Sequence, residues 1–266
     1  MDGATVTPRV RTEIRDRVGI ITLADPATLN AADSESMAAL TAALTGFIAD
    51  DAVTAILLTG EGRGFCSGAK LSAGGPAEGR PVAGPNLSLV AYFNPFLSAV
   101  RRSPKPLVAA VNGAAAGIGV SIALACDLVV AAESAYFLLA FRRIGLVPDG
   151  GATYLLPRLV GKARAMELML LGEKLPARTA LEWGLINRCV PDAELMEASL
   201  TLARALADGP ASLGLTRRLV WDGLDSSWSD QLEAEAYVQG DAARTPDARE
   251  GIAAFIGKRP AKFQGK

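Results

Sequence analysis

Apolar and polar residues alternate with a period of two near the start of the chain, over residues 9–13 and 18–23. A polar Arg-Asp-Arg turn separates the two stretches, a pattern typical of an antiparallel hairpin. Residues 34–48 instead repeat apolar side chains at helical spacing, with Asp33 or Ser34 available as the N-terminal cap. The opening therefore predicts two strands followed by an amphipathic helix.

Continuous apolar runs further along the chain predict buried strands. Between them, residues 72–88 are rich in glycine, proline and alanine, which predicts a surface loop of the kind that serves as a lid. Helices are predicted over 87–100 and 117–125. The buried strands are predicted at 54–59, 107–111, 128–131 and 135–138.

Beyond Pro148 the apolar spacing is helical throughout. Strands with glycine-rich turns before this point and helices after it predict an α/β core with a helical C-terminal part. The predicted helices cover 150–156, 163–171, 177–183, 195–207, 211–221, 229–239 and 247–258.

The composition adds limits on size, partners and location. Half of the 266 residues are apolar, enough for one α/β domain with an appendage or for two small domains. The 27 basic and 28 acidic residues nearly cancel, so no nucleic-acid or membrane partner is expected. The first residues lack a signal-peptide core and no apolar run reaches about 18 residues, which favours a cytoplasmic protein.

The absence of histidine restricts the chemistry most. It excludes Ser-His-Asp and Cys-His nucleophilic catalysis and imidazole acid–base work. It also removes most zinc sites, and the three cysteines include no CxxC pair, so no metal site is expected. The remaining chemistry must use carboxylates, backbone dipoles or a bound cofactor.

Two glycine-rich turns follow predicted strands, at 62–71 and 111–128. Each places free backbone N–H groups near the end of a strand, and the second opens a helix whose dipole adds positive potential. Together they can hold one oxygen atom of a ligand. Taken singly, each is equally a tight turn that needs glycine for its backbone geometry.

Five segments, in this order, resemble those of the enoyl-CoA hydratase/isomerase (crotonase) superfamily, and the likeness covers almost the whole chain. They are GRGFCSGAKL at 62–71, VNGAAAGIGVSIALACDL at 111–128, GLVPDGGATYLLPRLVG at 145–161, LPARTALEWGLINRCV at 175–190 and EGIAAFIGKRPAKF at 250–263.

The resemblance implies a crotonase-like spiral of ββα units over residues 1–194 and a helical trimerisation region over residues 195–266. It also implies a homotrimer or a dimer of trimers. The implied substrate is an acyl-CoA thioester, with no separate cofactor because coenzyme A is part of the substrate.

The resemblance also assigns an oxyanion hole, formed by the backbone N–H groups of Ala69 and Ile118 beside Gly68 and Gly117. Such donors stabilise the enolate that forms from a thioester carbonyl, and one donor is worth about 3 kcal/mol. The family usually carries glycine where this chain has Ile118.

Catalytic carboxylates are where this chain departs from the family hydratases, whose two glutamates match Ser121 and Phe141. Ser121 either orients water or bonds a helix carbonyl, and Phe141 is expected to shape the acyl pocket. Several family isomerases carry a single catalytic carboxylate at the position of Asp149, and one base suffices to move a double bond. Asp149 also precedes a predicted helix, so capping is its alternative role. As a base it would need apolar walls to raise its pKa, for which Phe141, Ile144 and Leu146 are candidates.

The remaining assignments concern coenzyme A. By resemblance, Leu29, Ser67, Ala69 and Leu71 line the pantetheine and adenine path, and Phe255 and Lys258 reach across from a neighbouring subunit. Lys70 replaces a common aspartate and either pairs with a phosphate or is solvated. The neighbouring Arg142 and Arg143 are expected on a solvated face.

Double-bond isomerisation of an acyl-CoA with Asp149 as base is the function predicted first. The alternatives are enoyl-CoA hydration or other thioester chemistry at an atypical site, and a catalytically silent acyl-CoA-binding subunit.

Overall fold

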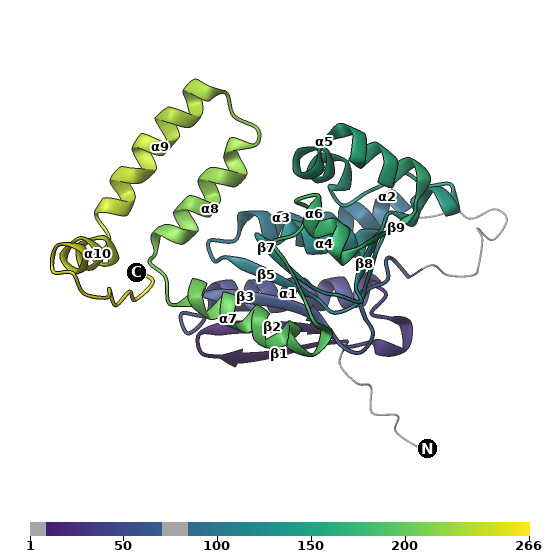
Figure 1. Ribbon diagram of the computed structural model, residues 1–266, viewed down its shortest axis with the longest axis horizontal. Coiled ribbons are helices and arrows are strands. Elements are labelled where there is room, and N and C mark those ends of the chain that lie inside the picture. The colour runs from purple at the N-terminus through teal and green to yellow at the C-terminus, as the bar shows by residue number, and fades with distance from the viewer. Residues whose placement is uncertain (1–8, 71–84) are drawn as a thin grey trace, which may run out of the picture.

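The computed structural model describes residues 9–70 and 85–266 (Figure 1). The predicted contact residue Leu71 and residues 72–84 of the predicted loop therefore lie outside the described residues, and the end of that predicted loop forms helix α2 (Pro85–Ser88) instead. Within the described residues, no helix combines the length and apolar character needed to cross a membrane.

A six-stranded sheet forms the centre of the molecule, in the order β1-β2-β3-β5-β7-β10. The first two strands form the predicted antiparallel hairpin, and every later pair is parallel. Its middle strands are buried on both faces, which explains their continuous apolar runs. The strands are β1 Val10–Arg15, β2 Val18–Leu23, β3 Ala55–Gly60, β5 Leu107–Val111, β7 Leu128–Ala132 and β10 Arg188–Val190.

A second sheet of short strands repeats the order of the first, as β4-β6-β8-β9. Each of β3, β5 and β7 is followed in the chain by a short strand of this second sheet and then by helices. This repetition is the predicted spiral of ββα units. Strands β4 and β6 lie inside the glycine-rich turns and, like β9 and β10, were not predicted, because three residues seldom show a period; β8, also three residues long, was predicted at 135–138. The short strands are β4 Gly64–Cys66, β6 Ala114–Ala116, β8 Tyr136–Leu138 and β9 Lys174–Pro176.

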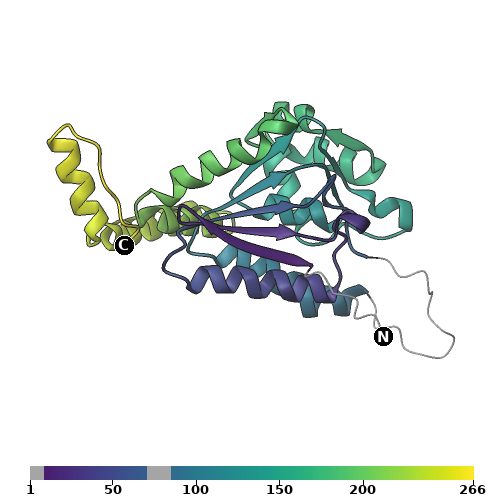
Figure 2. The ribbon, with the colours of Figure 1, turned by 90° about the horizontal axis from the view of Figure 1, so that it is seen from below.

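Helices cover both faces of the large sheet, with α1 on one side and α7 on the other (Figure 2). Asp33 caps α1 in a capping box with Ser36, so Asp33 rather than Ser34 is the cap. The predicted helices at 150–156 and 163–171 form one element, α5, bent at Gly161. The helices up to this point are α1 Ser34–Ala49, α2 Pro85–Ser88, the π-helix Leu89–Phe93, α3 Asn94–Arg102, α4 Ile118–Ala125, α5 Ala152–Leu171 and α6 Ala177–Glu182, with short 3-10 turns at Pro26–Thr28, Ala140–Ile144 and Asp192–Glu194.

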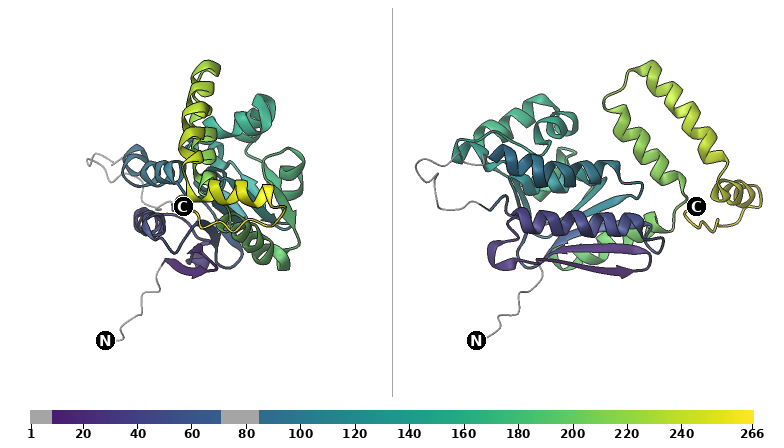
Figure 3. Two further views of the ribbon diagram at one scale, coloured as in Figure 1. Left: turned by 90° about the vertical axis from the view of Figure 1, so that its left-hand side faces the viewer. Right: turned by 180° about the vertical axis from the view of Figure 1, so that it is seen from behind.

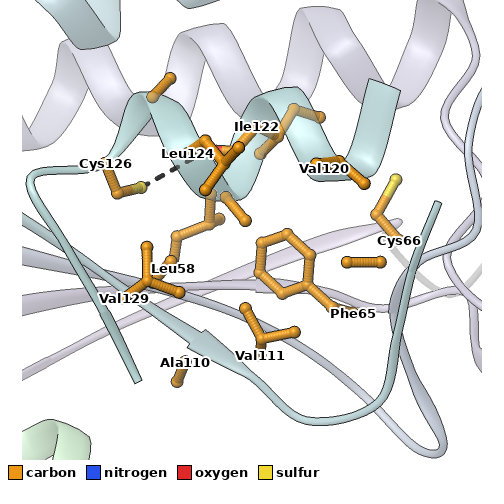
Figure 4. Close-up of a cluster of buried hydrophobic side chains, with 14 of the residues drawn as sticks. Leu58, Phe65, Cys66, Ala110, Val111, Val120, Ile122, Leu124, Cys126 and Val129 are labelled. Atoms are coloured by element: carbon orange, nitrogen blue, oxygen red, sulfur yellow. Dashed lines mark hydrogen bonds between the residues drawn. The ribbon is translucent and has the colours of Figure 1, made fainter. Parts of the chain in front are cut away.

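Helix α4 is the centre of the core. All 8 of its residues are buried, and its side chains pack against Leu58, Phe65 and Val129 from the strands (Figure 4). A Cβ on Gly119 would lie 2.2 Å from the carbonyl oxygen of Cys66, so the first turn of α4 packs directly on the end of β4. This fixes where the N-terminus of α4 points.

The C-terminal helices separate into one that packs on the large sheet and three that project from it. Helix α7 (Leu195–Ala207) packs against β3 and β5, whereas α8 (Ser212–Gly223), α9 (Trp228–Ala243) and α10 (Pro246–Ile256) extend away (Figures 1 and 3). Helix α9 has no buried residue. The division into residues 1–194 and 195–266 stays a prediction.

Candidate active site

The two glycine-rich turns lie against each other. Gly68 has φ +113° and Gly117 has φ +51°, backbone conformations that favour glycine. A Cβ on Gly117 would lie 3.7 Å from the Cα of Gly68, and one on Gly68 would lie 3.3 Å from the carbonyl oxygen of Ala116. Two segments about fifty residues apart in sequence therefore lie against each other.

The amides of Ala69 and Ile118 are both free to bind a ligand. Lys70 donates its N–H to Ala32, and Ala32 donates to Gly68, so the N–H of Ala69, between these bonded groups, points to the opposite side of the extended segment. Ile118 is the first residue of α4, where a backbone N–H has no partner within the helix. Neither amide has an acceptor among the described residues. Their role as oxyanion donors stays a prediction.

Asp149 does not cap the helix that follows it. Helix α5 begins at Ala152, its N-cap is Gly151, and no side chain caps it, so the capping alternative is wrong. The Asp149 Oδ1 atom is buried and has no hydrogen-bond partner among the described residues. Burial is the larger influence and raises the pKa of this carboxyl group, while its own backbone amide lowers the pKa by less.

Ser121 and Gly150 join the Asp149 loop to α4. The Ser121 hydroxyl donates to the carbonyl oxygen of Asp149 at 2.9 Å, and neither of the two roles expected for this serine describes that contact. A Cβ on Gly150 would lie 2.2 Å from Cδ1 of Ile118 and 2.8 Å from Cβ of Ser121. Residue 150 is thus a contact point of the site that sequence reasoning missed, although the Gly-Gly pair after Asp149 was a signal for it.

Phe141 and the residues near it divide into buried and exposed positions. Phe141 is buried, and its ring comes within 3.8 Å of where a Cβ of Gly117 would lie. Ile144 and Leu146 are 51% and 42% exposed, so they are not the closed apolar walls that were predicted. Arg142 and Arg143 are exposed, as expected, and they also donate to the carbonyl oxygens of Leu171 and Gly172 at the end of α5, which stabilises that helix terminus.

The predicted coenzyme A contacts fall in two places. Leu29 lies beside the first turn, where its carbonyl accepts the N–H of Ser67, and the Ser67 hydroxyl donates to Thr28. Lys70 is exposed and its Nζ lies 3.9 Å from Oδ2 of Asp33, a partner that neither alternative for Lys70 included. Phe255 lies in α10 and Lys258 in the turn that follows it, in the part of the chain that projects from the core (Figure 1), and the Phe255 side chain is 85% exposed. Their substrate-binding roles stay predictions.

Asn30 supports the first turn and was also missed. Its buried side chain donates to the carbonyl oxygens of Glu61 and Gly64 and accepts the N–H of Asp25. The backbone of Asn30 has φ +59°, a conformation asparagine tolerates better than most residues, which was the available signal. Among residues 9–70 and 85–266, no group of three or more His, Cys, Asp or Glu side chains is placed to hold a metal ion.

Asp149→Asn is expected to raise the free energy of unfolding at neutral pH by about 1 kcal/mol, because it removes the charge of a partly buried carboxylate and leaves an uncharged polar side chain in its place. Since the folded-state pKa is raised, the ionised carboxylate costs stability above that pKa. The cost disappears as the pH falls toward the unfolded value of about 3.9. Thermal unfolding of the parent and of Asp149→Asn from about pH 7 to pH 4 should show that the extra stability of the variant decreases as the pH falls. A stability difference that does not change with pH, or a variant less stable than the parent at neutral pH, would contradict this account.

Known proteins share both the sequence and the fold of this chain. The family model for enoyl-CoA hydratase/isomerase matches residues 13–266. The chain is 40% identical over 258 residues to a 1,2-epoxyphenylacetyl-CoA isomerase of Escherichia coli K12, covering 97% of this chain and 98% of that protein. It is 44% identical over 260 residues to a probable enoyl-CoA hydratase of Rhodobacter capsulatus, with the same two coverages. A crystal structure of a putative enoyl-CoA hydratase from Streptomyces coelicolor superposes with a TM-score of 0.87 at 39% identity, over 100% of this chain and 98% of that one. The chain therefore belongs to the enoyl-CoA hydratase/isomerase family and is an enzyme of the crotonase superfamily.

Proposed function

We propose that the protein isomerises an acyl-CoA thioester by moving one proton with Asp149. The observation that carries the proposal is the buried, unpaired Oδ1 of Asp149 on a loop that packs directly on the first turn of α4. A carboxylate with a raised pKa is suited to accept a proton near neutral pH. The Escherichia coli relative is named as the isomerase of a CoA ester, 1,2-epoxyphenylacetyl-CoA, which supports isomerisation as the class of reaction.

In the proposed reaction the thioester oxygen sits between the N–H groups of Ala69 and Ile118. Asp149 takes a proton from the carbon next to the carbonyl, and the electron pair moves onto the oxygen as a dienolate, which the two amides stabilise. The same carboxylic acid then returns the proton two carbons further along. A 3-enoyl-CoA becomes the conjugated 2-enoyl-CoA, and Asp149 is restored as the base.

Enoyl-CoA hydration is the second candidate, since the Rhodobacter capsulatus relative is named as a probable hydratase. Hydration must deliver the oxygen of water to one carbon and a proton to the next, which the family hydratases do with two carboxylates. Here the matching positions are Ser121, whose hydroxyl is bonded to Asp149, and the buried Phe141. Neither side chain can exchange protons as a carboxylate does, so isomerisation is the better supported reaction.

The proposed substrate complex includes coenzyme A and neighbouring copies of the chain. The projecting helices carry strongly exposed apolar side chains, among them Trp228, Tyr237, Ile252 and Phe255. Exposed apolar side chains gathered on helices that project from the core are the kind of surface that a partner covers. A homotrimer or dimer of trimers would cover it and would bring Phe255 and Lys258 toward a neighbour's coenzyme A.

The test compares two reactions of the purified protein. It should convert a 3-enoyl-CoA to the 2-enoyl-CoA at least about 10²-fold faster than it hydrates crotonyl-CoA, because hydration lacks its second acid–base group. Absorbance of the conjugated thioester follows both reactions. Faster hydration would favour the hydratase. Binding of acyl-CoA without turnover would favour a silent binding subunit.

A further inference from the structure

The hydrogen-bond partner of Ser121 is unusual for a serine inside a helix. A serine inside a helix commonly donates to a carbonyl one turn earlier in its own helix. Ser121 is fully buried within α4 and instead donates to the carbonyl oxygen of Asp149 at 2.9 Å. That same carbonyl accepts the N–H of Ala152 at 3.1 Å. The backbone of Asp149 is therefore bonded to α4 on one side and to the start of α5 on the other.

The residue after Asp149 strengthens the attachment. Gly150 has φ +61°, and a Cβ there would overlap Cδ1 of Ile118, at 2.2 Å, and crowd Ser121. A side chain at position 150 would be strained by this φ and would force Ile118 and Ser121 to shift, so the loop backbone rests directly on these two side chains. One turn of helix, from Ile118 to Ser121, thus carries both the predicted oxyanion amide and the support of the loop that holds Asp149.

We propose that Ser121 is a positioning residue, which fixes the Asp149 carboxylate relative to the oxyanion amide of Ile118 by bonding the Asp149 carbonyl. The proposal rests on the function proposed above for Asp149. Proton transfer needs the carboxylate within hydrogen-bond reach of its target carbon. A displacement of about 1 Å can lower a rate about 100-fold. Ser121 touches neither substrate nor reacting atoms in this role.

The first experiment measures kinetics of Ser121→Ala. We expect kcat for isomerisation to fall about 10- to 100-fold while KM for the acyl-CoA stays within about twofold, because the amides and the acyl path are unchanged. Ser121→Thr, which keeps the hydroxyl, should recover part of kcat. Ser199→Ala is the matched control, since Ser199 is also fully buried but its hydroxyl has no partner among the described residues; its kcat should equal that of the parent.

The second experiment does not depend on catalysis. The amide of Ala152 donates to the same Asp149 carbonyl, so its hydrogen–deuterium exchange should quicken about fivefold in Ser121→Ala, from the loss of one hydrogen bond that holds the loop, and stay unchanged in Ser199→Ala. Unchanged exchange, or a KM effect without a kcat effect, would overturn the positioning role. Faster exchange in a protein whose turnover does not need Asp149 would uphold the attachment and overturn the function proposed for that base.

Discussion

Asp149→Asn should lower kcat for isomerisation by about 10²- to 10⁴-fold, the range that one positioned general base contributes. Asparagine keeps the size of the side chain and leaves the backbone of residue 149 unchanged, so its carbonyl still accepts from Ser121 and Ala152. The two free amides of the glycine-rich turns are also unaffected. The loss should therefore appear in kcat, while the dissociation constant of a saturated acyl-CoA, measured by calorimetry, stays close to the parent value.

The pH dependence of the parent enzyme gives a separate check. Burial raises the pKa of Asp149, and the base works only when ionised, so kcat should fall as the pH drops through a midpoint above the ordinary aspartate value of about 3.9. The residual rate of Asp149→Asn should lose this acid limb. The control is Asp51→Asn, at an exposed turn after α1, which should keep both rate and pH profile. An Asp149→Asn enzyme with nearly full kcat would remove Asp149 from the mechanism.

The sequence predicted most of what depends on periodicity. The hairpin, α1, the buried strands β3, β5 and β7, and the helices of the C-terminal part lie within a few residues of their expected positions. The overall spiral came from the resemblance, because strands of three residues such as β4 and β6 are too short to show alternation. Their backbone pairing, rather than their side chains, places the two glycine-rich turns together.

The parts of the site that depend on main-chain geometry could be predicted from the sequence. The parts that depend on which side chains bond each other were harder to predict. Glycine at positions 68 and 117 indicated two turns that could face one ligand, and the two turns lie against each other in the structure. The partner of the Ser121 hydroxyl, 28 residues away, has no local signal in the sequence. Likewise Asp-Gly-Gly before a helix is compatible with a cap, and only the position of Gly151 as N-cap separates the two roles of Asp149.

Two adjacent arginines also show that the local sequence does not reveal the partner of a side chain. Arg217 and Arg218 stand side by side in α8, and the local sequence does not distinguish them. Arg217 is buried; it pairs with Asp127 at 2.6 Å and donates to the carbonyl oxygens of Val100, Arg101 and Ser103 at the end of α3. Arg218 is exposed and lies 3.6 Å from Asp222 one turn later. Only the contact of α8 with α3 decides which arginine is structural.

Arg217→Met should lower the free energy of unfolding by about 3–5 kcal/mol, the cost of breaking a buried ion pair from one side. The change leaves Asp127 with the indole of Trp221 and the N–H of Leu107 as donors, but without a countercharge. It also leaves the three carbonyl oxygens at the end of α3 without the guanidinium donors. For a chain of this size the melting temperature should fall by about 6–20 °C.

The matched control is Arg218→Met, which should change the free energy of unfolding by less than about 0.5 kcal/mol because an exposed helical ion pair is worth little. Adding Asp127→Asn to Arg217→Met removes the uncompensated charge while keeping an oxygen for Trp221. The double variant should therefore be less destabilised than the sum of the two single variants, since each single change breaks the same pair. Equal melting temperatures for Arg217→Met and Arg218→Met would show that the pair does not join α8 to the core. Strict additivity would instead show that Arg217 acts through the α3 carbonyls alone.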